Sequence, residues 1–249
     1  MRDKLYLWAH KEGTQNNRFN IPGISRISPV DACYYMGIEN VIMVKNCFGQ
    51  PSPDEYEKYA ESFKSLKKVV WSLTGAGGKY EEGEMERIIS LKKKYPNIIG
   101  AIMDDFFVPE VYSFKPAEIS EIRKVLHENE MELWTVIYEH QLGLSIEDYL
   151  KEFDVITYWT WFGNRLEDLE KSFEEFLKKV GDKRKMLGCY MWDYGNEKPL
   201  SLNLMKKQCN LGLKWLSENK IEGMIFLASC VVDLKLDTVE WVRKWIKSL

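Results

Sequence analysis

The chain has 249 residues, of which 45% are hydrophobic and 29% are charged, and its formal net charge is -3. This length and composition supply a large core and fall in the size range of a single α/β barrel, so we expect one domain over residues 1–249. Lysine and glutamate are mixed along the chain rather than gathered in a basic block, which argues against nucleic acid as a partner.

No hydrophobic run approaches the roughly 20 residues that span a bilayer, and the first residues lack the order of a signal peptide. We therefore expect a soluble, cytoplasmic protein, although a secretion signal removed from the chain would leave no trace. The five cysteines, Cys33, Cys47, Cys189, Cys209 and Cys230, are odd in number and show no CxxC spacing. This predicts reduced thiols rather than disulfides or a structural zinc site.

Strand-like apolar segments alternate with segments of helical spacing along the whole chain. The predicted strands are Leu5–Ala9, Asn40–Val44, Val69–Leu73, Ile98–Met103, Leu133–Tyr138, Val155–Trp161, Met186–Trp192 and Gly223–Ala228. The predicted helices are Asp54–Leu66, Glu84–Tyr95, Pro116–Asn129, Leu166–Val180, Leu202–Asn219 and Thr238–Lys247. This alternation indicates parallel strands and is typical of the (β/α)8 TIM barrel, an α/β fold.

An open, doubly wound sheet is the alternative architecture. It normally has a glycine-rich turn after its first strand, and His10-Lys-Glu-Gly-Thr14 does not match G-x-G-x-x-G. The chain has no Walker A motif either, so the barrel is the better prediction.

Polar and aromatic residues gather where the predicted strands end, at the rim that carries the active site in TIM barrels. The candidates for substrate binding are Trp8, His10, Lys45, Asn46, Tyr138, Trp159, Trp161, Trp192, Asp193 and Ser229. The opposite strand ends begin with ordinary solvated or turn-forming residues such as Asn40, Lys68 and Asn97. This asymmetry is the main functional signal in the sequence.

Two adjacent carboxylates follow the apolar run that begins at Ile98, namely Asp104 and Asp105. Successive side chains of a strand point to opposite faces, so we expect one of the two to enter the barrel mouth and the other to face the helices. The structural alternative is that an Asp after a strand caps a helix or fixes a turn.

Carboxylates together with tryptophans at one rim favour a sugar as substrate, because indole rings pack on the apolar faces of pyranoses. Cleavage of a glycosidic bond needs one protonated carboxyl group and one ionised carboxylate. We expect Asp104 or Asp105 and Glu139 to share these catalytic roles, with Asp193 in reserve. No cofactor and no metal are expected, and the partner would be a small or oligosaccharide substrate.

The chain resembles the glycoside-hydrolase-like TIM barrels, in which an acid at the end of the fourth strand is a recurrent catalytic feature. The segment Gly100-Ala-Ile-Met-Asp104-Asp-Phe106 is similar, in its Gly and one Asp, to the D-x-x-D-x-D-x-E signature of chitinase-like barrels. Phe106 stands where that motif has its catalytic Glu, so the resemblance implies the fold and a carbohydrate-related activity but not the chitinase mechanism.

Several candidates have structural alternatives. Each tryptophan could pack between the barrel and its helices, and Glu139 could form an ion pair with Lys45 or Lys11. Asp193 could cap the turn at Gly195-Asn196. Cys47 and Cys230 reach the same rim but lack a placed His partner, which argues against a thiol nucleophile.

Two other functions remain open. A metal-dependent sugar isomerase or hydrolase would use His10, Asp104 or Asp105, Glu139 and His140 as ligands. A barrel that binds a glycan without cleaving it would also show an incomplete catalytic signature.

Overall fold

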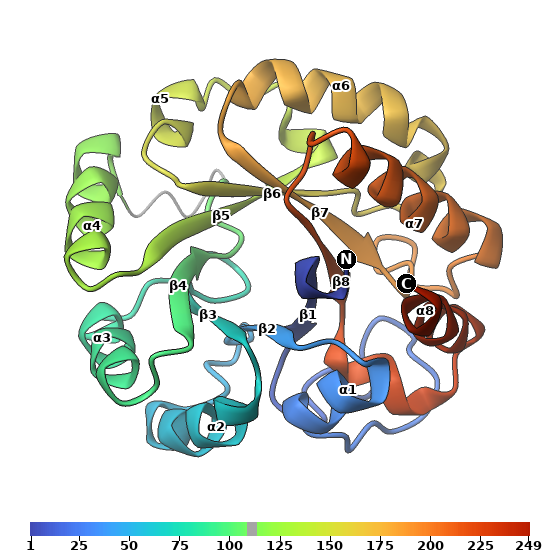
Figure 1. The fold of residues 1–249 in the computed structure, drawn as a ribbon, viewed down its shortest axis with the longest axis horizontal. Helices are drawn as coiled ribbons and strands as arrows, with labels where there is room; N and C mark the ends of the chain where they lie inside the picture. The colour runs from blue at the N-terminus through green and yellow to red at the C-terminus, as the bar shows by residue number, and fades with distance from the viewer. Residues whose placement is uncertain (109–113) are drawn as a thin grey trace.

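The computed structural model describes residues 1–108 and 114–249, which form a closed barrel of eight parallel strands paired in chain order (Figure 1). The strands are β1 (Leu5–Ala9), β2 (Asn40–Met43), β3 (Lys68–Thr74), β4 (Ile98–Met103), β5 (Glu132–Tyr138), β6 (Val155–Trp159), β7 (Arg184–Tyr190) and β8 (Gly223–Leu227). The barrel closes where β1 pairs with β8, in a register that sets Trp8 opposite Leu227. The predicted (β/α)8 fold is therefore confirmed.

The strands read as continuous hydrophobic runs because both of their faces are covered, one by the barrel interior and one by the helices. Large aromatic side chains fill the interior. The rings of Trp134 and Tyr6 lie 5.7 Å apart, and those of Trp159 and Trp8 lie 5.2 Å apart. Gly188 in β7 leaves the space that the Trp159 indole occupies, since a Cβ atom there would lie 2.1 Å from the ring.

The helices form a ring around the barrel (Figure 1). They are α1 (Pro29–Met36), α2 (Tyr56–Ser62), α3 (Glu84–Lys94), α4 (Pro116–Glu128), α5 (Glu147–Leu150), α6 (Leu169–Val180), α7 (Leu202–Ser217) and α8 (Asp237–Ser248). Short 3-10 helices add η1 (Arg2–Lys4), η2 (Pro53–Glu55), η3 (Phe63–Ser65), η4 (Glu139–Gln141), η5 (Gly163–Asp168) and η6 (Ser229–Leu234). The predicted helices starting at Asp54 and Leu166 each begin with a 3-10 segment, η2 and η5.

Two helices were not predicted, α1 and α5. The signals for α1 are present in the sequence: Ser28 Oγ accepts a hydrogen bond from the Asp31 amide, Pro29 occupies the first turn, and Gly37 ends the helix at a φ of 72°. The helix α5 has only four residues, too few to show helical periodicity.

Two predicted strands end two residues too late. The sixth strand stops at Trp159 rather than Trp161, and the seventh stops at Tyr190 rather than Trp192. The last partner of β7 on β8 is Leu227, which pairs with Tyr190. Trp161 and Trp192 therefore belong to the loops that surround the barrel mouth.

None of the helices in the described ranges is long and apolar enough to cross a membrane. All five cysteines are free thiols, four of them buried, and Cys47 is exposed.

Candidate active site

A cavity of about 230 Å³ opens at the carboxyl ends of the strands. Each of the eight strands, or the loop that follows it, contributes to its wall. The lining residues are Trp8, His10, Thr14, Gln15, Arg18, Phe19, Asn46, Cys47, Ala76, Gly77, Asp104, Asp105, Tyr138, Trp161, Tyr190, Tyr194 and Leu227. Of the residues predicted from the strand ends, the structure brings together here Trp8, His10, Asn46, Asp104, Asp105, Tyr138 and Trp161.

Both members of the acid pair line the cavity, which corrects the expectation that one would face the helices. The strand β4 already ends at Met103, so the alternation of side chains does not continue through the pair. Asp105 has a φ of 48°, in the left-handed region that non-glycine residues rarely adopt. This local turn of the backbone lets consecutive residues contribute to one wall.

Asp104 is buried, with 4% of its surface exposed. Burial is the main cause that raises the pKa of its carboxyl group well above the ordinary range, and the adjacent Asp105 charge adds to the effect. Its backbone is fixed to β3, because Thr74 Oγ1 donates to the Asp104 carbonyl at 2.8 Å. The structure therefore favours a protonated carboxyl group at Asp104.

Asp105 is half-buried and its carboxylate accepts two hydrogen bonds from neighbouring elements. The Tyr138 hydroxyl donates to Oδ1 at 2.8 Å, and the Gly77 amide donates to Oδ2 at 2.8 Å. Desolvation and the Asp105 charge raise the pKa of Tyr138 well above its ordinary value, so this hydroxyl keeps its proton. Asp105 is thus held as an acceptor between β5 and the loop after β3.

His10 is buried and lines the same cavity as the acid pair. Its Nδ1 lies 3.0 Å from the Val44 carbonyl oxygen, which can only accept, so Nδ1 carries the proton and Nε2 has the lone pair. Burial is the main cause that lowers the pKa of His10 to about 4, with a contribution from the Arg18 charge. His10 therefore presents a neutral imidazole with one acceptor nitrogen.

Aromatic rings build the other wall of the cavity. The Trp161 ring lies 5.8 Å from Tyr190 and 6.0 Å from Tyr194, and Phe19 lies 5.2 Å from Tyr194. Such a wall suits the apolar faces of a sugar ring, as argued for the tryptophans of the sequence.

Lys45 lies away from the cavity in a buried ion network. Its Nζ is 3.0 Å from Glu84 Oε2 and 3.0 Å from Glu81 Oε2. The suggested ion pairs of Glu139 with Lys45 or Lys11 are therefore wrong, because Lys11 pairs with Glu55 at 2.7 Å. Lys45 links the end of β2 to α3 rather than facing a ligand.

Three further predicted residues form hydrogen bonds within the protein instead of lining the cavity. Trp159 is buried in the barrel, where its Nε1 donates to Thr157 Oγ1 at 2.8 Å. Trp192 Nε1 donates to the Phe19 carbonyl at 2.9 Å. Ser229 Oγ accepts from the His10 amide at 3.1 Å. None of these three side chains is among those that line the cavity.

Asp193 fixes a turn, as the structural alternative predicted. Its Oδ1 accepts from the Gly163 amide at 2.9 Å and from the Asn196 amide at 3.1 Å. Glu139 begins η4, so the alternation of β5 ends at Tyr138, and Glu139 is not among the cavity-lining residues. Tyr138 takes the place on the cavity wall that the sequence assigned to both residues.

Of the ligands of the metal hypothesis, His10, Asp104 and Asp105 line the cavity, whereas Glu139 and His140 do not. Within residues 1–108 and 114–249, no group of three or more His, Cys, Asp and Glu side chains is placed to hold a metal ion. His140 is exposed and stacks on Tyr138, with 5.4 Å between the ring centroids.

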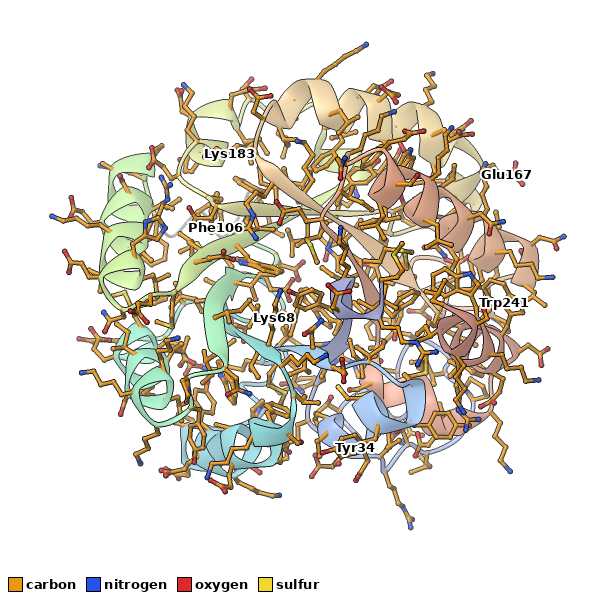
Figure 2. The ribbon with its side chains drawn as sticks, viewed as in Figure 1. Tyr34, Lys68, Phe106, Glu167, Lys183 and Trp241 are labelled. Atoms are coloured by element: carbon orange, nitrogen blue, oxygen red, sulfur yellow. The ribbon has the colours of Figure 1, made fainter. Side chains whose placement is uncertain are left out.

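Phe106, labelled in Figure 2, is fully buried. Its ring packs against the rings of Tyr149 and Phe153. At this position the chitinase-like motif has its catalytic Glu, and here the side chain belongs to the packing between the barrel and α5. Phe106, which stands in place of that Glu, therefore has a packing role.

Sequence reasoning missed much of the cavity wall. The residues concerned are Thr14, Gln15, Arg18, Phe19, Tyr190 and Tyr194. Thr14, Gln15, Arg18 and Phe19 lie in the long segment between β1 and α1, which the search for strand ends did not cover. Length was the available signal, since loops of more than about 15 residues in a compact barrel are commonly functional. Gly77, in the loop after β3, also lines the cavity.

No family model and no curated protein matches the chain. Among solved structures, a chitinase from Chromobacterium violaceum matches with a TM-score of 0.59 and 9% identity, over 98% of this chain and 99% of that chain. A GH113 β-mannanase from Alicyclobacillus acidocaldarius matches with a TM-score of 0.59 and 11% identity, over 100% and 97%. A xylanase and α-amylase inhibitor protein matches with a TM-score of 0.61 and 13% identity, over 98% and 97%. At these identities the likeness shows the shared barrel fold alone.

Proposed function

We propose that the protein is a glycoside hydrolase that acts on a small or terminal sugar unit. One observation carries the proposal: two neighbouring carboxyl groups line the same aromatic cavity in opposite environments. Asp104 is buried, while Asp105 accepts hydrogen bonds from the Tyr138 hydroxyl and the Gly77 amide. Pairs of carboxyl groups whose environments differ in this way are what glycosidic cleavage requires.

In this proposal Asp104 is the general acid and donates its proton to the leaving glycosidic oxygen. Asp105 is the carboxylate that acts as nucleophile or as the base that activates water. Tyr138 and Gly77 hold the Asp105 oxygens in place, so this group does not need to reorient when charge develops at the sugar. Glu139, outside the cavity, receives no role.

The remaining walls suit the polar and apolar sides of a pyranose. Trp161, Tyr190 and Tyr194 offer ring faces and edges. His10 Nε2 can accept from a sugar hydroxyl, and the Asn46 amide nitrogen can donate, since Asn46 Oδ1 is already used by the Phe48 and Gln50 amides. The cavity of about 230 Å³ lies below the roughly 300–1,000 Å³ typical of drug-sized ligands, which favours a single ring.

The proposal is tested by product release from a panel of aryl glycosides and oligosaccharides, with and without EDTA. Asp104→Asn and Asp105→Asn should each lower turnover by about 100-fold or more, because acid, base and nucleophilic roles typically contribute that much. Asp148→Asn, at an exposed carboxylate in α5, is the matched control and should leave turnover unchanged. Turnover that survives in both cavity variants would contradict the assignment, and turnover abolished by EDTA would favour a metal enzyme.

A glycan-binding barrel without turnover is the second candidate function. The observation that favours it is Phe106, which occupies in the packed core the position of the chitinase-like catalytic Glu. One structural neighbour, a xylanase and α-amylase inhibitor protein, is described in complex with trehalose. Saturable binding of a sugar by wild-type protein, with no product from any member of the panel, would support this candidate over the hydrolase.

A further inference from the structure

Arg18 places a positive charge on the wall of the cavity. It lies in the loop between β1 and α1, and no Asp or Glu of the described ranges is within ion-pairing distance of its guanidinium group. By contrast, the lysines at the adjoining strand ends are neutralised, Lys11 by Glu55 and Lys45 by Glu84. A cation that faces a concave site and lacks an internal partner is available to a ligand.

Two aromatic rings hold the guanidinium group. Its central carbon lies 5.1 Å from the Phe19 ring and 4.9 Å from the Phe48 ring. One nitrogen, Nη1, donates to Cys47 Sγ at 3.5 Å. Stacking of this kind orients the planar group and leaves most of its five N–H donors unused, which lowers the entropic cost of binding an anion.

In the part of the chain that the structure describes, neither carboxylate of the acid pair forms an ion pair with Arg18. The Asp105 oxygens accept from the Tyr138 hydroxyl and the Gly77 amide, and the environment of Asp104 favours its neutral form. The charge of Arg18 nevertheless acts inside the cavity, because it contributes to the lowered pKa of His10. The positive charge of Arg18 therefore acts on this side of the cavity.

We propose that the cavity takes a sugar that carries an anionic group, and that Arg18 binds this group. The proposal rests on the proposed function of the cavity as a sugar site and names its substrate class. A planar carboxylate, as in a hexuronic acid, fits the fork of a guanidinium group in bidentate fashion, and a phosphate ester offers the same chemistry. Neutral hexoses would lack the partner that Arg18 requires.

The test measures binding of free monosaccharides, which contain no glycosidic bond, so that turnover does not enter. Calorimetry and saturation-transfer NMR would compare glucuronic and galacturonic acids with glucose and galactose, and with glucose 6-phosphate as the phosphate arm. We expect at least one anionic sugar to bind about 10- to 100-fold more tightly than its neutral counterpart, as for a charge-assisted pair. Bound ligand should also slow alkylation of the exposed Cys47 thiol beside Arg18.

Variants identify the residue responsible. Arg18→Met should remove the preference for the anionic sugar, and Arg18→Lys should restore part of it while losing the bidentate geometry. Arg26→Met is the matched control, because Arg26 is an exposed arginine of the same loop that does not line the cavity. It should bind like the wild-type protein.

The inference is overturned if no anionic sugar binds better than its neutral counterpart, or if Arg18→Met and Arg26→Met behave alike. Its failure and that of the hydrolase proposal give different results. Hydrolysis of neutral glycosides that is unaffected by Arg18→Met would leave the hydrolase standing without the anionic substrate. Arg18-dependent binding of an anionic sugar, with no product from any glycoside, would leave a binding protein for such sugars.

Discussion

The buried carboxyl group of Asp104 makes the stability of the protein depend on pH. In the unfolded chain its carboxyl group ionises near the ordinary value of 3.8, whereas burial raises the pKa in the folded protein well above that value. Between these two pKa values the folded state holds the additional proton. The free energy of unfolding must therefore fall as the pH rises through this interval, and the loss is complete above the folded pKa.

We therefore expect Asp104→Asn to stabilise the protein, in contrast to the loss of turnover expected from the proposed function. The variant should melt at a higher temperature than the wild-type protein at pH 8, because the amide has no charged form to desolvate. The difference should shrink as the pH is lowered towards 3.8, where the carboxyl group is protonated in both states. Thermal unfolding across this pH range, with Asp148→Asn alongside, is the measurement. A difference in melting temperature that does not depend on pH would refute the argument.

At the residue scale, the sequence predicted which residues reach the carboxyl ends of the strands better than it predicted the role of each side chain. Strand ends indicated Asp104, Asp105 and Tyr138, which line the cavity, because position along a parallel strand determines which end of the barrel a residue reaches. The same rule could not separate side chains that line the cavity from those that support it. Lys45 depends on a partner 39 residues away, Glu84, and nothing local to either residue reveals that pairing.

The loop between β1 and α1 is the element that completes the site. It supplies Arg18 and Phe19 to the cavity, and side-chain hydrogen bonds attach it to the loop after β7. Trp192 Nε1 donates to the Phe19 carbonyl at 2.9 Å, and the Tyr194 hydroxyl donates to Gln15 Oε1 at 2.9 Å. The loop is therefore positioned by residues that come 173 and 179 positions later in the chain.

Trp192→Phe should loosen this loop while it leaves the barrel intact. The change keeps an aromatic ring but removes the donor to the Phe19 carbonyl, a hydrogen bond worth about 0.5–1.5 kcal/mol. We expect weaker ligand binding by several-fold and faster hydrogen exchange in residues 10–28, with no change in the exchange of the strands. Trp241→Phe, on α8, is the control. Equal exchange of the loop in both variants would show that this bond does not position it.

At the element scale the alternation of strands and helices was readable because long periodic segments carry strong signals. The predicted strands agree with the observed ones except for small differences at their ends. The helix α5 was not predicted because it is short, and the role of the β1–α1 loop was not predicted because that segment has no periodicity. The left-handed backbone of Asp105 was also beyond prediction, since a non-glycine residue at a φ of 48° depends on the contacts around it. The shape of the active-site wall follows from these irregular segments.

The whole molecule depends on close packing of aromatic rings inside the barrel. Gly188 and Trp159 meet on neighbouring strands, where a methyl group at position 188 would overlap the indole. Because the barrel is closed, neither strand can move outward without disturbing its other neighbour. The barrel interior below the cavity is thus specified by the complementary sizes of these two residues.

Gly188→Ala should therefore lower the stability of the entire barrel. Overpacking of a close-packed core typically costs about 1–3 kcal/mol, and a contact of 2.1 Å calls for displacement of the ring or of a strand. Urea unfolding at neutral pH measures the loss. Gly143→Ala is the matched control, because no heavy atom lies within 4 Å of a Cβ atom built there. If the two alanine variants unfold at the same urea concentration, the interior is more adaptable than this packing implies.

The most direct measurement for the account as a whole compares Asp105→Asn with Glu139→Gln on the glycoside panel. The strand ends of the sequence favour both carboxylates, whereas the structure places only Asp105 on the cavity wall. We predict that Asp105→Asn loses turnover by about 100-fold or more and that Glu139→Gln keeps a rate close to that of the wild-type protein. The reverse result, a strong loss in Glu139→Gln with Asp105→Asn active, would contradict the proposed site.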